Sequence, residues 1–166
     1  MRKILSMALL VLATALFVGC ASTKSIQKTD AGKFQYELEG VGNATQGAYL
    51  VKVWTYSPTK YANIEECKKN AVHGVIFKGY AASGQVRAQQ PLVREAGAQM
   101  THADYFNQFF ADGGEYNRYV TVTQGSQEVL RVGKTYKIGL VVSVSKDQLR
   151  KALESAGVVK PLNYGF

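Results

Sequence analysis

The chain has 166 residues, with 20 Lys and Arg against 12 Asp and Glu, so its formal net charge is +8. Hydrophobic residues make up 46% and charged residues 19%, a balance that excludes a disordered polar chain and suits one domain of ordinary size. Two cysteines and two histidines exclude a disulfide scaffold and a multi-cysteine metal cluster, and we expect no cofactor and no metal.

The first twenty residues indicate an export signal that ends in a lipidation site. Arg2 and Lys3 precede an apolar run from Ile4 to Val18, which has the length of a signal peptide and is too short to span a bilayer. The run ends in Leu16-Phe17-Val18-Gly19-Cys20, which resembles a bacterial lipobox. The resemblance implies cleavage before Cys20, a diacylglyceryl group on its sulfur and an acyl chain such as palmitate on the new N-terminus. The alternative is an ordinary secretory signal with a chance cysteine.

The predicted lipidation site divides the chain into three parts. We expect a lipoprotein signal peptide at 1–19, a lipidated N-terminus and flexible tether at 20–33, and a single domain at 34–166. A tether of this length reaches about 20 Å. By resemblance to lipoprotein sorting rules, Ala21 after the cysteine favours the outer membrane, and the lack of an acidic cluster favours its periplasmic face over the cell surface. We expect no nucleic-acid partner for an exported chain.

The domain is expected to begin with a hairpin. Residues 34–41 alternate apolar and polar side chains, and residues 48–56 are rich in β-branched and aromatic ones, so both segments are predicted strands. Gly40-Val41-Gly42 resembles the start of a dinucleotide-binding loop. However, Thr45 stands where that fingerprint needs a third glycine, and a strand follows in place of a helix. We therefore predict a β-hairpin with its turn at residues 42–47.

A helix is predicted from about residue 59 to 73. Its apolar side chains recur at helical spacing, and Gly74 is expected to end it. Asn63, three residues before Glu66, is a second candidate for its N-cap. Residues 75–77 then predict a buried strand.

Cys67 and His73 are the candidate reactive residues of this helix. Cys67 lies on the predicted apolar face, which favours a buried structural thiol over a reactive thiol activated by Lys68 and Lys69. His73 falls at the predicted C-terminus, where a cation caps a helix favourably. One thiol and two separated histidines make no recognisable catalytic triad, so we expect no enzyme activity.

Residues 82–100 show no periodicity and contain scattered Gly and Pro. Long connections of this kind are often mobile or functional, so we predict that this segment is the most mobile part of the domain and its contact segment. Arg87 and Arg94 are the possible contact residues, because the guanidinium fork binds carboxylates and phosphates. A solvated connector with no role is the alternative.

The rest of the chain predicts a helix from residue 101 to about 112, three strands at 116–123, 128–132 and 135–144, and a last helix that Gly157 ends. The strand at 135–144 has the clearest alternation. The complete order predicts an α+β fold, with a largely antiparallel sheet and helices packed on one face.

Three stretches carry a family resemblance: Asn70 to Gly79, Tyr105 to Gly114 and Val132 to Phe166. They resemble a family of uncharacterised Gram-negative lipoproteins, and the order of elements resembles the N-terminal domain of flagellar assembly protein T and related small outer-membrane lipoproteins. The resemblance implies an accessory role in an envelope assembly and no catalytic residues. We therefore expect a lipid-anchored, non-enzymatic domain that binds another envelope protein. The alternative is a lipoprotein that binds a ligand or cell-wall polymer through a basic face.

Overall fold

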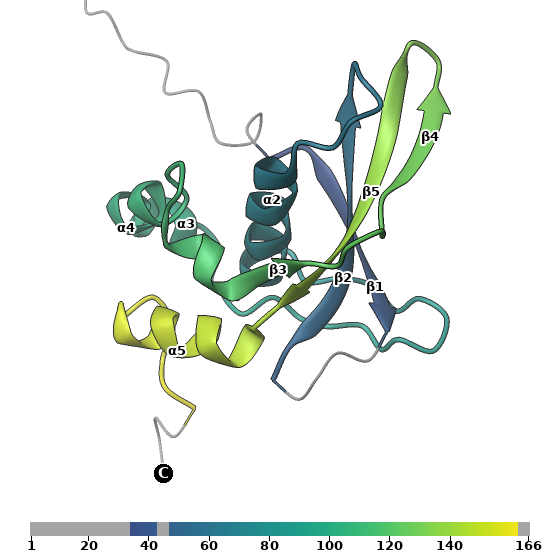
Figure 1. The fold of residues 1–166 in the computed structure, drawn as a ribbon. Helices are drawn as coiled ribbons and strands as arrows, with labels where there is room; N and C mark the ends of the chain where they lie inside the picture. The colour runs from purple at the N-terminus through teal and green to yellow at the C-terminus, as the bar shows by residue number, and fades with distance from the viewer. Residues whose placement is uncertain (1–33, 43–46, 163–166) are drawn as a thin grey trace, which may run out of the picture. The chain divides into compact units, whose positions relative to one another are not determined.

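The computed structural model describes residues 34–42 and 47–162. Within them, five strands form an antiparallel sheet, and the helices lie on one side of it (Figure 1). This confirms the predicted α+β fold class. The expected signal peptide and tether, residues 1–33, lie outside the described residues.

The sheet is built around β5 (Thr135–Val144). β5 pairs along most of its length with β2 (Tyr49–Ser57), which pairs on its other side with β1 (Tyr36–Gly42), as the predicted hairpin requires. The opposite side of β5 pairs with two short strands, β3 (Val120–Val122) and β4 (Glu128–Val132). These two strands lie one after the other along the same side of β5.

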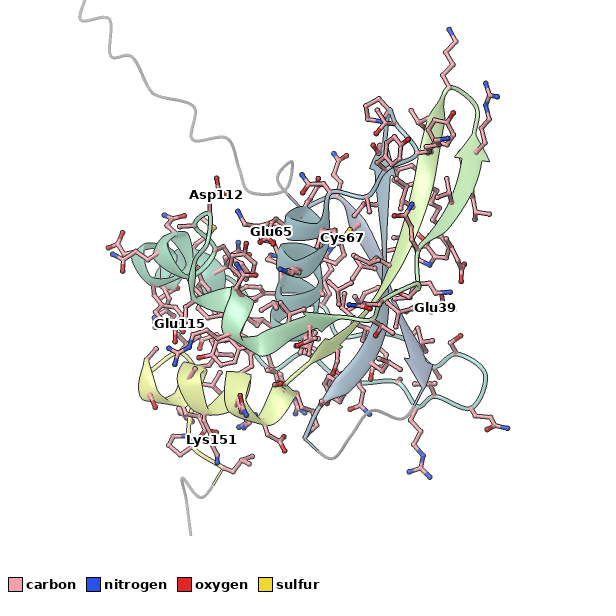
Figure 2. All side chains as sticks on the ribbon, viewed as in Figure 1. Glu39, Glu65, Cys67, Asp112, Glu115 and Lys151 are labelled. Atoms are coloured by element: carbon pink, nitrogen blue, oxygen red, sulfur yellow. The ribbon has the colours of Figure 1, made fainter. Side chains whose placement is uncertain are left out.

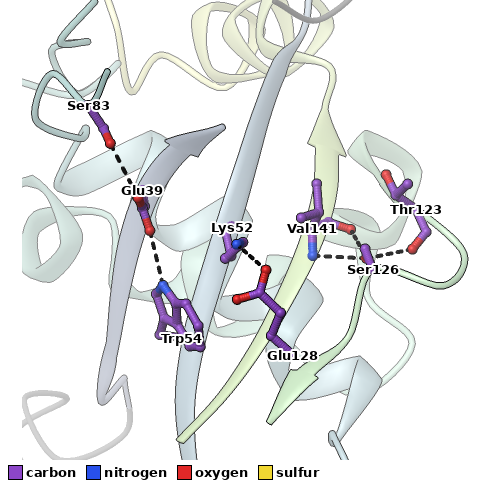
Figure 3. Close-up of polar contacts among 8 residues, drawn as sticks. All are labelled: Glu39, Lys52, Trp54, Ser83, Thr123, Ser126, Glu128 and Val141. Carbon is purple, nitrogen blue, oxygen red and sulfur yellow. Dashed lines mark hydrogen bonds and ion pairs between the residues drawn. The ribbon is translucent and has the colours of Figure 1, made fainter. Parts of the chain in front are cut away.

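A serine side chain bridges the gap between β3 and β4. Ser126 Oγ donates to the carbonyl oxygen of Thr123 at 2.6 Å and accepts from the backbone N–H of Val141 at 3.1 Å (Figure 3). The hydroxyl thus satisfies backbone groups that a continuous strand would have paired. Beyond this gap, β4 pairs with residues 135–139 of β5.

The core lies between the sheet and α2 (Ile64–Phe77). Alternate side chains of β5 are buried, as predicted from their spacing, and each apolar side chain of this size contributes about 1.5–3 kcal/mol when fully buried. The central residues of this layer come from β2, β5 and α2: Val51, Val53, Ile138, Leu140, Val142, Cys67, Ala71, Val72, Val75 and Ile76.

The predicted bounds of α2, from about residue 59 to 73, are wrong at both ends, although the second N-cap candidate, Asn63, is confirmed. The helix begins after Asn63, whose side chain accepts from the backbone N–H of Glu66 at 3.3 Å. It continues through Gly74 to Phe77, so the strand expected at 75–77 does not form. Gly74 lies where the helix passes close to β1, since a Cβ there would lie 2.7 Å from the Leu38 side chain. The glycine therefore permits close packing and does not end the helix.

The segment expected to lack regular structure is partly ordered by backbone hydrogen bonds. Two antiparallel bridges, Tyr80 to Gln89 and Ser83 to Val86, fold it back on itself. The N–H groups of Leu92 and Val93 then donate to carbonyl oxygens of the last turn of α2. The next helix begins earlier than predicted, as α3 (Ala98–Thr101), and α4 (Ala103–Phe109) follows it.

The strand predicted at 116–123 is mostly a 3-10 helix, η2 (Glu115–Tyr119), followed by the short β3. Tyr116 and Tyr119, three residues apart, fall on one side of this helix and both are buried, which overrides their preference for strands. The last helix, α5 (Lys146–Ser155), ends before Gly157 as expected.

Candidate functional site

The sequence-predicted site residues lie in different places. Cys20 lies outside the described residues. Arg87 and Arg94 are both exposed, but only Arg94 lines an open groove beside α5, whereas Arg87 follows the tight Ser83–Val86 turn. The structure thus separates two arginines that the sequence places in one segment.

Cys67 lies between α2 and the sheet, with its side chain fully buried (Figure 2). Its Sγ is 3.8 Å from the Thr55 hydroxyl oxygen. Burial raises the pKa of the Cys67 thiol above its ordinary value, which disfavours the thiolate needed for nucleophilic chemistry. The predicted burial of Cys67 is confirmed.

This burial makes Cys67 a reporter of opening of the core. In a chain that begins at Ala21, Cys67 is the only thiol. We expect a maleimide reagent to label it roughly a hundredfold or more slowly in the native protein than in denaturant, because the thiol must wait for local unfolding. Mass spectrometry over time measures the rate. Equal native and denatured rates would place Cys67 at the surface and reopen a redox role.

His73 is not the helix cap that the sequence indicated. It lies inside α2, and its ring is buried and stacked on Phe34 with the ring centroids 3.8 Å apart. Nδ1 is 2.7 Å from the Tyr36 hydroxyl, and Nε2 is 3.2 Å from the Gln99 side-chain oxygen. His73 therefore ties β1, α2 and α3 together, a structural role that the corrected length of α2 explains.

The sheet face opposite the helices carries the only tryptophan of the chain. The Trp54 ring packs against Gly139 of β5, where a Cβ would lie 2.7 Å from the ring. Lys52 and Lys137 flank it, with their Nζ atoms 5.3 and 5.2 Å from the ring centroid. Trp54 Nε1 donates to Glu39 at 3.2 Å (Figure 3). The glycine thus lets the indole lie across the sheet and cover its neighbouring strand.

Ion pairs across the strands complete this face. Lys52 of β2 contacts Glu128 of β4 at 2.5 Å, and Lys137 of β5 contacts Glu37 of β1 at 2.7 Å. Both lysine side chains are mostly buried, with exposed fractions of 15% and 21%. The polar groups at the centre of this face therefore already have partners within the domain. The margins of the face are the candidate binding surface.

Most of the large exposed apolar side chains of the described residues lie at one margin of the sheet. Among the described residues, nine large apolar side chains are exposed, and six of them lie in β4, at the end of β2 or in the segment from β2 into α2. Figure 1 shows β4 and the start of β5 projecting beyond the helices at this end. The side chain of Gln127 donates to the carbonyl of Lys60 at 3.2 Å and joins the two parts. We call these six residues the hairpin end: Tyr56, Tyr61, Ile64, Val129, Leu130 and Val132.

The two long edges of the sheet differ in how they are covered. Beside β1, a segment from outside the sheet contacts the strand, because Ser83 donates to Glu39 at 3.2 Å and a Cβ at Gly40 would meet Tyr80 and Val86. β4 pairs with β5 on one side, and no described strand pairs with its other side. All five β4 residues are exposed. β4 therefore offers both apolar side chains and unpaired backbone groups.

In the described part of the chain, no three His, Cys, Asp or Glu side chains gather as a metal site would require. No helix among residues 34–42 and 47–162 has the length and apolar character needed to cross a membrane.

Comparison of the chain with protein-family models, with curated proteins and with solved structures finds no match.

Proposed function

We propose that this chain is a lipid-anchored, non-enzymatic interaction domain at the periplasmic face of the outer membrane, and that it binds another envelope protein through the hairpin end. The lipobox-like sequence before Cys20 supports the anchor. The observation that supports protein binding is the gathering of exposed apolar side chains beside an open strand edge, with exposed fractions between 41% and 68%. Surfaces of this kind commonly bind partners.

The proposed occupant is an extended segment of the partner that adds a strand to β4. Strand addition satisfies the unpaired backbone groups of an edge, and alternate side chains then select the sequence. The register with β5 places Leu130 on the face of Lys137 and Val129 on the opposite face, with Ile138. A matching strand would carry apolar side chains beside Leu130 and Val132 on one face and an acidic one beside Arg131 on the other.

The place where the described chain begins fits this arrangement. Tyr36, the first residue of β1, pairs with Thr55 of β2. Thr55 pairs in turn with Ile138 of β5, and Ile138 pairs on its other side with Val129 of β4. The hairpin end and the start of the domain therefore lie at the same end of the sheet. An anchor attached through a short tether would keep the hairpin end near the membrane, where other anchored envelope proteins are concentrated.

Site-specific photo-crosslinking in the native envelope tests the proposal with the full chain. A benzophenone amino acid is placed at position 130 or 132, and at Met100 as a more exposed apolar control on another surface. Strand addition predicts adducts from 130 and 132 to one protein, at partner residues two apart in one segment, since side chains on one face of a strand recur every second residue. Leu130→Asp should lower the yield from position 132 about tenfold.

Several results would reject the proposed partner. These are adducts to lipid alone, adducts scattered over many proteins, or adducts from position 100 in equal yield. A membrane-contact role for the hairpin end would be indicated if the chain lacking the anchor sedimented with anionic vesicles and Leu130→Asp abolished that binding. Either finding leaves the assignment of Cys20 untouched, because that assignment is tested separately.

A further inference from the structure

A second surface lies at the other end of the sheet from the hairpin end. An open groove of about 770 Å³ runs between residues 88–95 and the first half of α5, and the chain after α5 forms its far side. Tyr49, at the start of β2, and Lys146, at the start of α5, mark its position. Because Tyr49 pairs with Val144, this groove lies at the opposite end of β2 and β5 from Leu130.

The lining of the groove is apolar at its base. Val93 and Val158 are buried and belong to the hydrophobic core, and Leu92 and Val159 are partly buried against that core. Leu162 lies at the edge of the groove with 76% of its side chain exposed. The volume lies in the range of pockets that hold small molecules. A ligand seated here would therefore cover the exposed apolar surface of Leu92, Val159 and Leu162.

The polar lining is mainly basic. Arg94, Lys146, Arg150 and Lys160 line the groove, against Glu95 and Asp147. Lys146 contacts Asp147 at 2.5 Å and Arg150 contacts Glu154 at 2.8 Å, so these two cations are already compensated. Arg94 is different, because no carboxylate of the described residues lies within ion-pair distance of its guanidinium.

From this combination we infer that the groove binds a single-chain anionic amphiphile, with its hydrocarbon chain on the apolar base and its carboxylate or phosphate head on Arg94. The guanidinium fork can bind both oxygens of such a head. A neutral sugar would leave Arg94 unused, and a ligand without a hydrocarbon chain would leave Leu92 and Leu162 exposed. The inference concerns a different surface from the hairpin end and does not depend on it.

Titration calorimetry with decyl phosphate below its micellar concentration tests this, using the chain from Ala21, which keeps every described residue. Residues 33–166 form one compact unit, and the core of the described part of the chain, from Tyr36 to Val158, is retained in this protein. Arg94→Ala should weaken binding about tenfold, as expected for loss of a charge-assisted hydrogen bond. Arg87→Ala is the matched control, because it removes the same exposed side chain from the same segment outside the groove, and binding should be unchanged.

The contact of the hydrocarbon chain with Leu162 is tested separately. Leu162→Ser alters an exposed residue, so the fold should persist while binding weakens several-fold. Decanol, which has the same chain without the charge, should bind at least about tenfold more weakly than decyl phosphate. Equal losses in Arg87→Ala and Arg94→Ala, equal binding of decanol, or no binding at millimolar decyl phosphate would each overturn the inference. Binding to anionic vesicles without binding to the monomeric amphiphile would also overturn it.

Discussion

Replacing Cys20 with Ser should move the protein from the membrane fraction to the soluble periplasmic fraction. The thioether to diacylglycerol needs the cysteine sulfur, and the serine hydroxyl does not replace it in lipobox processing. Each buried CH₂ of an acyl chain contributes about 0.8 kcal/mol, so two or three chains hold a protein at a membrane almost permanently. The expected change is therefore close to complete, and immunoblots of fractions from intact cells measure it.

Cys67→Ser provides the matched control for Cys20→Ser. It removes the other cysteine of the chain and leaves the lipobox-like sequence unchanged, so the protein should stay in the membrane fraction. Mass spectrometry of the N-terminal peptide adds a direct readout, with acyl chains present in Cys67→Ser and absent in Cys20→Ser. If Cys20→Ser remains in the membrane fraction after a high-salt wash, the anchor assignment is wrong.

The sequence predicted the parts of the fold in which one local pattern decides the structure. The alternation along β5 reflects a strand with one buried face, and the structure buries that face against α2. Cys67 was predicted to be buried because it shares a helical face with Ala71, and both are fully buried. In these segments, the tertiary packing agrees with the local periodicity.

The predictions failed where a distant residue decides the local structure. Gly74 resembles a helix end in sequence, but the nearby Leu38 side chain shows that the glycine serves the packing of α2 on β1. Tyr116 has strand propensity, yet a 3-10 turn lets it enter the core and donate to Glu65 at 2.9 Å. Neither partner is close in sequence, so no local pattern could reveal them.

The candidate sites could be predicted from the sequence even less well than the fold. β4 was predicted as a strand, but its exposure follows from its pairing with only residues 135–139 of β5 beyond the helices. Arg87 and Arg94 were equivalent candidates, and only the course of the chain places Arg94 on the groove. The sequence indicated which residue types could make contacts, whereas the fold determines which of them share a surface.

Replacing Gly79 should have a large effect on the stability of the domain. Gly79 turns the chain out of α2 towards the segment that lines the groove. Its φ angle is +66°, a conformation that costs an L-residue about 1–2 kcal/mol. A Cβ at this position would also overlap the backbone carbonyl oxygen of Gln89, which cannot move aside as a flexible side chain would. Gly79→Ala should therefore lower the free energy of unfolding by at least about 3 kcal/mol, a large part of the 5–15 kcal/mol typical of a domain.

Gly84→Ala separates the two causes of that loss. Gly84 has a φ angle of +56°, but a Cβ there would meet nothing within 4 Å, so only the backbone strain of about 1–2 kcal/mol should appear. Urea denaturation of both variants, followed by the fluorescence of Trp54, measures the difference. Because Gln89 and Pro91 line the groove, any folded Gly79→Ala should also bind decyl phosphate more weakly, whereas Gly84→Ala should bind it normally. Equal destabilisation by the two substitutions would show that the segment after α2 shifts to accommodate a side chain at position 79.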